Sequence, residues 1–196
     1  QFFPFSEPRS EQITAIDFIL NSYASGKKFV ICDLSTGIGK SAIAVTVSKY
    51  MQMKNHPSET RGTWYLTTQK TLQKQYINDF GNHKVVQLKS LKSANNYQCQ
   101  IFDKSSISMS CAEIQRLMNA HKFFQTMYKT CVCKCRYRDE KEKFIEADDS
   151  LTNYSYFLAE SMYAKGIKAR DLLILDEAHT IEETLLREIR EETGIL

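Results

Sequence analysis

Apolar residues along this chain follow two alternating patterns, short continuous runs and helical spacing. Three runs bounded by polar or glycine-containing segments predict buried strands at Lys28–Cys32, Thr63–Thr67 and Leu172–Leu175. Helical spacing predicts a first helix over Ser10–Ala24, capped by Ser10. It also predicts a helix after each run: one that begins at Lys40, one that contains Leu72, Tyr76 and Phe80, and one from Ile181 to Gly194. The alternation of strand and helix favours an α/β fold with a parallel, doubly wound sheet covered by helices on both faces.

A glycine-containing loop lies between the first predicted strand and its helix, with the sequence Ser35-Thr36-Gly37-Ile38-Gly39-Lys40-Ser41. Strand, glycine loop and helix in this order form the context that a phosphate-binding loop requires. The glycines let the backbone wrap an anion, and the helix start presents free N–H groups to it. Lys40 is expected to contact the β- and γ-phosphates of ATP and Ser41 to bind Mg²⁺, while Ser35 to Gly39 donate backbone hydrogen bonds. Leu34 stands where this motif usually has glycine or alanine.

An acidic pair follows the last apolar run, in the sequence Asp176-Glu177-Ala178-His179. Ligands bind beyond the carboxyl ends of strands in open α/β sheets, so Asp176 is placed to hold Mg²⁺. Glu177 is then placed to orient the attacking water, and His179 to link the site to moving parts. Taken alone, such a pair more often begins a helix. Together with the phosphate loop, it predicts a RecA-like nucleotide hydrolase.

The chain's positive charge is concentrated in one segment. Of the 196 residues, 42% are hydrophobic, and the net charge of the whole chain is +3. Residues 84–143 hold twelve Lys and Arg against five Asp and Glu, a net charge of +7, so the rest of the chain carries −4. A basic segment on a near-neutral body suggests a path for nucleic acid, although a solvated lysine-rich surface would look the same. No apolar run reaches the length of a membrane span, so we expect a soluble intracellular protein in the cytoplasm or nucleus, or a viral protein in host cytoplasm.

Five of the six cysteines lie in this basic part of the chain, at Cys99, Cys111, Cys131, Cys133 and Cys135. In a reducing compartment, clustered cysteines favour a metal site over disulfides. The sixth, Cys32, is expected to be a small core residue on the first strand. We therefore divide the chain into residues 1–90, a cysteine-bearing insertion at 91–143, and residues 144–196, with the first and last parts forming one domain.

Several segments resemble the DEAH-box branch of superfamily 2 helicases, and within it the XPD/DinG group of iron–sulfur helicases. Phe3-Pro4-Phe5 with Arg9 and Gln12 is similar to the adenine-sensing motif of that group. Thr67 to Gln75 resembles motif Ia, which grips single-stranded DNA in relatives. Leu91 to Cys99 resembles the segment that leads to the first cluster cysteine. Cys135-Arg136-Tyr137 resembles the last cluster ligand and its surroundings, although relatives usually carry proline in place of Arg136. Thr152 to Leu158 resembles the segment before the DEAH strand.

This resemblance implies an ATP- and Mg²⁺-dependent DNA helicase whose first motor domain holds a [4Fe–4S] cluster. Its ligands would be Cys99, Cys111, Cys135 and Cys131, with Cys133 as the alternative to Cys131. Zn²⁺ is the rival metal. The implied partners are single-stranded or forked DNA and a second RecA-like domain of the same polypeptide, so this chain alone should hydrolyse ATP weakly. Two alternatives remain, a nucleic-acid-binding module with a structural nucleotide and a zinc-containing translocase that does not unwind DNA.

Overall fold

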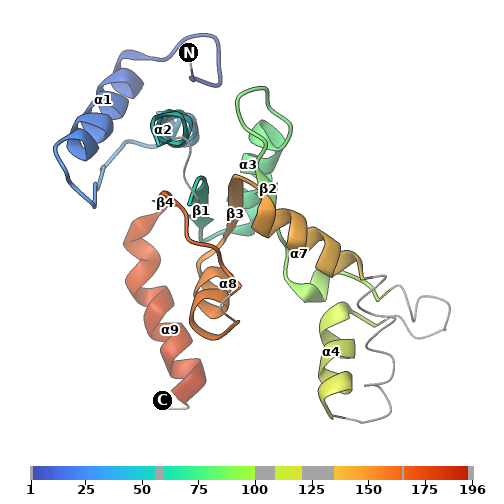
Figure 1. Cartoon of the computed structure of the whole chain (residues 1–196). Coiled ribbons are helices and arrows are strands. Elements are labelled where there is room, and N and C mark those ends of the chain that lie inside the picture. Colours follow the sequence, from blue (N-terminus) through green and yellow to red (C-terminus); the bar gives the residue numbers. More distant parts are fainter. Residues whose placement is uncertain (1, 56–59, 100–108, 121–134, 165, 194–196) are drawn as a thin grey trace.

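The computed structural model describes residues 2–55, 60–99, 109–120, 135–164 and 166–193 (Figure 1). In chain order its elements are α1 (Ser10–Ala24), α2 (Lys40–Lys54), β1 (Thr63–Thr67), α3 (Lys70–Phe80), β2 (Lys89–Ser90), η1 (Ala94–Asn96), α4 (Cys111–Ala120), α7 (Arg136–Glu146), β3 (Asp149–Asn153), α8 (Tyr154–Ala159), η2 (Glu160–Ala164), β4 (Leu172–Leu175), η3 (Ala178–Thr180) and α9 (Ile181–Thr193). Among these described residues, no helix is long and apolar enough to span a membrane.

The described strands form one parallel sheet in the order β2-β3-β1-β4. β1 is central and pairs along its length with β3, where Tyr65 lies opposite Leu151, and with β4, where Tyr65 lies opposite Ile174. Parallel neighbours require crossover connections, and helices supply them here. The predicted α/β fold with a parallel sheet and helices on both faces is therefore confirmed.

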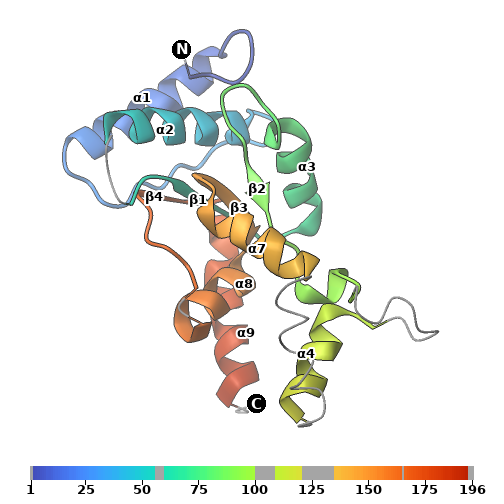
Figure 2. The ribbon, with the colours of Figure 1, turned by 45° about the vertical axis from the view of Figure 1, so that its right-hand side comes forward.

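Two apolar clusters cover opposite faces of the sheet because neighbouring residues of a strand point to opposite sides. Tyr65 packs with residues of α2, α3 and the segment that follows α3, including Val45 and Phe80. Trp64 packs on the other face, its ring 5.3 Å from that of Phe144 in α7. Figure 2 shows α1 and α2 on one side of the sheet and α8 and α9 on the other. The sheet is thus buried on both faces around β1.

The predicted strand at Lys28–Cys32 is wrong. The structure gives this segment no regular secondary structure, and the side chains of Phe29 and Ile31 are 90% and 89% exposed. The run pairs with no strand among the described residues, and β4 remains the edge of the sheet there, so the apolar side chains of the run are not buried against a sheet. Cys32 is consequently half-buried in a loop rather than in the core, although burial still raises the pKa of its thiol.

The start of α1 also differs from the prediction. Ser10 is the first helical residue rather than the cap, and Arg9 occupies the cap position. The Arg9 backbone N–H donates to Gln12 Oε1 at 2.8 Å, and the Ser10 hydroxyl donates to the Glu11 carboxylate. A side chain on the first turn thus satisfies a backbone donor at the helix entry, and the helix does not depend on the Ser10 hydroxyl for its cap.

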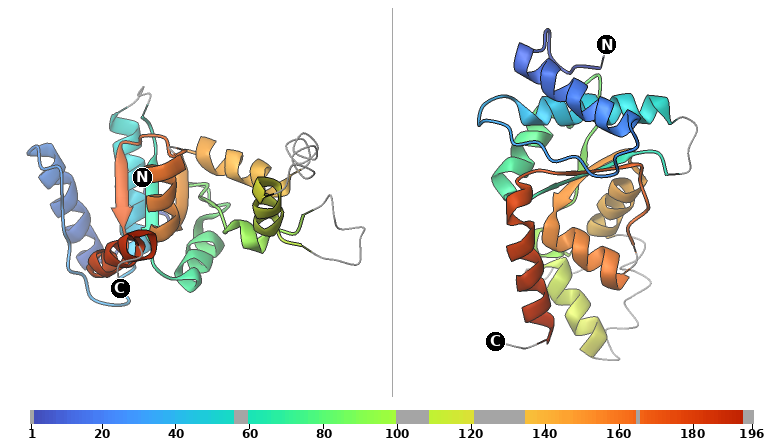
Figure 3. Two further views of the ribbon diagram at one scale, coloured as in Figure 1. Left: turned by 90° about the horizontal axis from the view of Figure 1, so that it is seen from below. Right: turned by 90° about the vertical axis from the view of Figure 1, so that its left-hand side faces the viewer.

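The part of residues 91–143 that the structure describes extends away from the sheet. It begins after β2, runs through η1 and α4, and returns to β3 through α7 (Figure 3). α4 lies at the opposite end of the molecule from α1 in both Figure 1 and Figure 3. The described cysteines of this region are consequently remote from the phosphate loop.

Candidate nucleotide-binding site

The glycine loop turns directly into α2. Gly37 and Gly39 have φ values of 80° and 85°, a region that favours glycine, and Gly39 occupies the cap position of α2. A Cβ atom on Gly39 would lie 2.6 Å from Gln12 Nε2, so any other residue there would displace the Gln12 amide in addition to adopting an unfavourable φ. Lys40 and Ser41 follow in the first turn of the helix, both partly buried, while Ser35 and Thr36 are exposed.

The start of α1 contacts this loop through two side chains. Gln12 Nε2 donates to the Ile38 carbonyl at 2.8 Å, and Arg9 Nη1 donates to the Gly37 carbonyl at 3.3 Å. Gln12 is buried, with 5% of its surface exposed. The two residues that resemble an adenine-sensing motif are therefore placed against the phosphate loop, where they hold carbonyl groups of its backbone.

The acidic pair lies where β4 ends. The Asp176 N–H donates to the Leu66 carbonyl at 2.9 Å, which carries the pairing of β4 and β1 one residue past Leu175. Glu177 then has φ 57° and ψ 45°, and it is the only residue other than glycine with positive φ in the described part of the chain. Such a backbone costs roughly 1–3 kcal/mol and persists only where the surroundings impose it, which often marks a functional position.

Charges around Asp176 place it beside the phosphate loop. Burial raises the pKa of the Asp176 carboxyl, the Glu177 carboxylate raises it further, and the Lys40 ammonium acts in the opposite direction. Lys40 can exert this effect only from nearby, because charge interactions in water fall off over about 10 Å. The structure therefore brings the lysine of the loop and the first acidic residue to one end of the sheet, as expected for a shared ligand.

Two tyrosines complete the surroundings of Asp176. The Tyr154 hydroxyl donates to the Asp176 carbonyl at 2.9 Å, and burial together with Asp176 and Glu177 raises the pKa of Tyr154 to about 12. The Tyr76 hydroxyl hydrogen-bonds the Asp176 carboxylate, and burial raises its pKa strongly. Sequence reasoning missed both tyrosines. The only available signal was that Tyr154 directly follows a strand, whereas the spacing of Tyr76 indicated a core position.

His179 lies at the margin of the site. Its Nδ1 atom is 3.4 Å from Glu177 Oε2, and its side chain is 73% exposed. An imidazole in this position can orient the Glu177 carboxylate while remaining open to a partner. Glu177 and His179 thus lie together just past the carboxyl end of β4.

The described cysteines other than Cys32 lie close together near α4 and α7. Cys111 Sγ and Cys135 Sγ are 3.7 Å apart, and Cys99 packs in one apolar cluster with Cys135 and α4. Cys99 and Cys111 are buried. Across the residues that the structure describes, no group of three or more ligating side chains is arranged to hold a metal ion. Cys131 and Cys133, which compete for the fourth position, lie outside the described residues.

Comparison with known families gives one match over almost the whole chain. The family model described as ResIII, type III restriction enzyme, res subunit, matches residues 5–193. The matched range includes both the phosphate loop and the acidic pair. A search of curated proteins found no significant match.

Proposed function

The chain belongs to the ResIII family, named for the res subunit of type III restriction enzymes. From this membership we propose that it is the first motor domain of an ATP-dependent DNA helicase, and from the sequence resemblance that this helicase is of the XPD/DinG type. The family is one of ATP-hydrolysing, helicase-like motors, and the parallel sheet has the corresponding architecture. The observation that carries the proposal is the charge interaction of Lys40, in the first turn of α2, with Asp176, which follows the carboxyl end of β4.

In this proposal the loop backbone from Ser35 to Gly39 binds the phosphates of ATP. Lys40 neutralises the β- and γ-phosphates, and Ser41 and Asp176 hold Mg²⁺. Glu177 orients the attacking water, and its left-handed backbone just after β4 and its contact with His179 support this role. Magnesium supplies charge neutralisation at the γ-phosphate. Arg9 and Gln12 hold the loop in a shape that only glycine at position 39 permits.

A second motor half is part of the proposal, because such hydrolysis usually requires an arginine supplied across a domain interface. We therefore expect this chain to bind MgATP and to hydrolyse it slowly. Calorimetric titration of the chain with MgATP should give one binding site. In the full-length polypeptide, single-stranded DNA should raise ATP turnover, and strand displacement on a forked duplex should require ATP.

Absence of MgATP binding by this chain would contradict the proposed nucleotide site. A full-length polypeptide that binds MgATP and DNA without hydrolysis would instead support the alternative function, a nucleic-acid-binding module with a structural nucleotide. ATP turnover without strand displacement would support a translocase.

We further propose that Cys99, Cys111, Cys135 and one of Cys131 and Cys133 hold a metal centre, a [4Fe–4S] cluster by resemblance to the XPD/DinG group. The burial of Cys99 and Cys111 and their proximity to the partly buried Cys135 fit a thiolate site. The 3.7 Å between Cys111 Sγ and Cys135 Sγ equals, within about 0.1 Å, the separation of two thiolates on one tetrahedral ion with ~2.3 Å bonds. In a cubane each thiolate binds its own iron, so these two sulfurs must separate to accept a cluster.

Metal analysis decides between these centres. Protein purified without oxygen should contain about four irons per chain, absorb visible light and lose both properties on Cys111→Ser or Cys135→Ser substitution. Cys32→Ser is the matched control, because Cys32 lies in the loop before the phosphate-binding residues and should leave metal content unchanged. Colourless protein with one zinc per chain would overturn the cluster, and metal-free protein would overturn the centre altogether.

A further inference from the structure

We propose that a basic cleft at the amino ends of the strands binds the phosphate backbone of a nucleic acid, at a site separate from the nucleotide. The cleft has a volume of about 490 Å³ and lies between α2, the segment that joins α3 to β2, and the junction of α7 with β3. This volume falls in the range of about 300–1,000 Å³ that is usual for ligand sites. Four lysines line it, namely Lys49, Lys84, Lys89 and Lys143.

The fold brings these lysines together from distant parts of the sequence. Lys84 and Lys89 stand at the beginning of the basic segment 84–143, and Lys143 stands at its end. Parallel pairing of β2 with β3 places Lys89 opposite Ser150, and α7 ends just before β3, so both ends of the segment meet at one cleft. Lysines from the two ends of the basic segment are therefore brought together at one cleft.

The acidic residues of the cleft are already neutralised. Glu146 pairs with Lys168 at 2.5 Å, Asp148 pairs with Arg61 at 3.4 Å, and Asp149 pairs with Lys49. Within the described parts of the chain, Lys84 and Lys89 form no ion pair, and Lys143 only faces Glu140 at 3.5 Å, in an exposed position. The cleft consequently presents uncompensated positive charge, which favours an anionic ligand.

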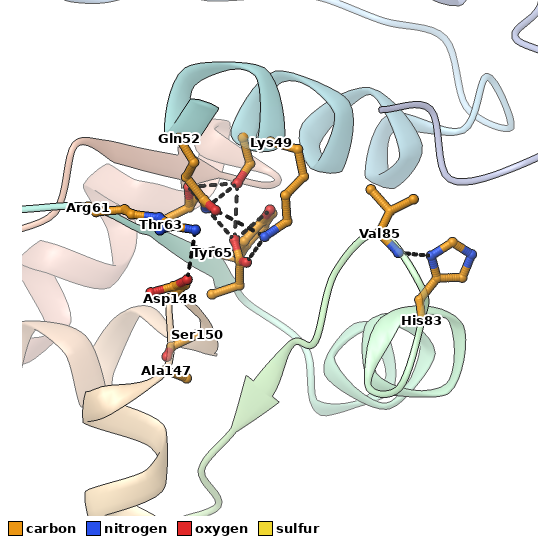
Figure 4. Close-up of polar contacts among 12 residues, drawn as sticks. Lys49, Gln52, Arg61, Thr63, Tyr65, His83, Val85, Ala147, Asp148 and Ser150 are labelled. Carbon is orange, nitrogen blue, oxygen red and sulfur yellow. Dashed lines mark hydrogen bonds and ion pairs between the residues drawn. The ribbon is translucent and has the colours of Figure 1, made fainter. Parts of the chain in front are cut away.

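A buried polar cluster fixes the floor of the cleft. Asp149 is 2% exposed and accepts hydrogen bonds from Ser48 Oγ at 3.0 Å and Gln52 Nε2 at 2.9 Å (Figure 4). Lys49 uses two of its three donor hydrogens on Asp149 and on Gln52 Oε1. At the far end of the loop, His83 Nδ1 accepts from the Val85 N–H at 3.2 Å and fixes the backbone between Lys84 and β2.

The ligand chemistry that suits lysine ammonium groups in an open cleft is the phosphate group. A phosphate could belong to a nucleic-acid backbone or to a free phosphorylated compound. The choice of a nucleic acid rests on the proposed function. The cleft is separate from the ATP site. The cleft lies where β3 begins, at Asp149, whereas the acidic pair follows the opposite ends of the strands. Strands of this length separate the two ends by roughly 15 Å.

The test is the salt dependence of binding to a fluorescent single-stranded oligonucleotide, measured by anisotropy. Each phosphate contact to a single strand contributes about 0.7 to the slope of log affinity against log salt. Lys84→Gln with Lys89→Gln should therefore flatten the slope by about 1.4 and weaken binding roughly 25-fold at 0.1 M salt. Lys143→Gln alone should flatten it by about 0.7, because the cleft joins both ends of the segment.

The matched control is Lys27→Gln with Lys28→Gln, which removes the same charge from two exposed positions after α1. It should leave both slope and affinity nearly unchanged. Titration with MgATP on every variant separates this site from the nucleotide site. All five lysines that are changed are exposed, so their substitution should leave ATP affinity intact even if the proposed motor function fails.

An unchanged slope in the Lys84/Lys89 variant would overturn the proposal. Lysine-dependent binding of inorganic phosphate, with oligonucleotide affinity unaltered by the same substitutions, would also overturn the nucleic-acid assignment and identify a free phosphorylated ligand instead. Equal losses in the cleft and control variants would show that only overall charge matters.

Discussion

Replacing Glu177 by glutamine is expected to leave MgATP binding intact and to lower ATP hydrolysis in the full-length polypeptide by roughly two to four orders of magnitude. The amide keeps the shape of the side chain but cannot accept a proton from the attacking water. The backbone of Glu177 is held in the left-handed region by the turn after β4, so the substitution should not displace the side chain. Single-turnover hydrolysis and calorimetric ATP titration measure the two effects separately.

The same variant should change the pH dependence of MgATP binding. Asp176 must be ionised to hold Mg²⁺, and its pKa is raised by burial and by the Glu177 charge, against the effect of Lys40. As the pH is lowered, the unmodified protein should therefore lose affinity for MgATP. This loss should begin at a higher pH than it would for an aspartate with an ordinary pKa. Glu177→Gln removes one cause of the raised pKa, so this loss of affinity should move to lower pH.

Glu183→Gln is the control, because Glu183 is an exposed carboxylate in the first turn of α9, a few residues away. It should change neither hydrolysis nor the pH profile. Equal hydrolysis by the Glu177 and Glu183 variants would remove Glu177 from the mechanism. A large loss of ATP affinity in the Glu177 variant would assign it to nucleotide binding rather than to water activation.

The parts of the site that the sequence predicts are those that depend on local geometry. A glycine loop before a helix specifies its own shape, since positive φ at Gly37 and Gly39 and the start of α2 follow from adjacent residues. The acidic pair is predicted because an apolar run such as Leu172–Leu175 forms a strand, and ligands lie beyond strand ends, although β4 is the edge strand of the described sheet rather than a central one. Strand topology alone does not bring the two halves together, because the segment before the glycine loop forms no strand in the described structure.

Residues whose role depends on a partner far along the chain escape such reasoning. The apolar run at Lys28–Cys32 predicts a strand, but only the three-dimensional arrangement decides whether a sheet edge is within reach. Asp149 reads as an exposed acidic residue, whereas the fold buries it against side chains of α2 about a hundred residues earlier. Arg170 likewise gives no signal in the sequence, because all its partners are carbonyl groups, a hydroxyl and a ring supplied by other elements.

Arg170 holds the amino ends of the sheet together. Its Nη1 atom donates to the Thr63 carbonyl at 2.8 Å, and its Nη2 atom lies within 3.1 Å of three acceptors, Ile145 O, Ala147 O and Ser150 Oγ. The guanidinium also stacks on Trp64, with its carbon 3.6 Å from the ring centroid. One side chain thus joins β1, the end of α7 and β3. Burial lowers its pKa to about 10, which still leaves it charged at neutral pH.

Substituting Arg170 by alanine should lower the free energy of unfolding by about 3–5 kcal/mol, because it leaves partly buried acceptors without a donor and removes the stacked group from Trp64. Urea denaturation followed by circular dichroism measures this loss. Arg170→Lys should recover only a small part of it, since one ammonium cannot reproduce the planar fork that serves several acceptors. Because the charge persists below about pH 10, the difference between the variants should be constant from about pH 6 to 8.

Arg61→Ala provides the matched control for this loss. Arg61 lies two residues before β1 and pairs with Asp148 at 3.4 Å, with both side chains largely exposed, so its removal should cost less than about 1 kcal/mol. A similar small cost for Arg170→Ala would mean that water replaces the guanidinium at its acceptors. Full recovery by lysine would mean that charge alone matters there, since only arginine can serve Thr63, Ala147 and Ser150 from one rigid plane while covering the face of Trp64.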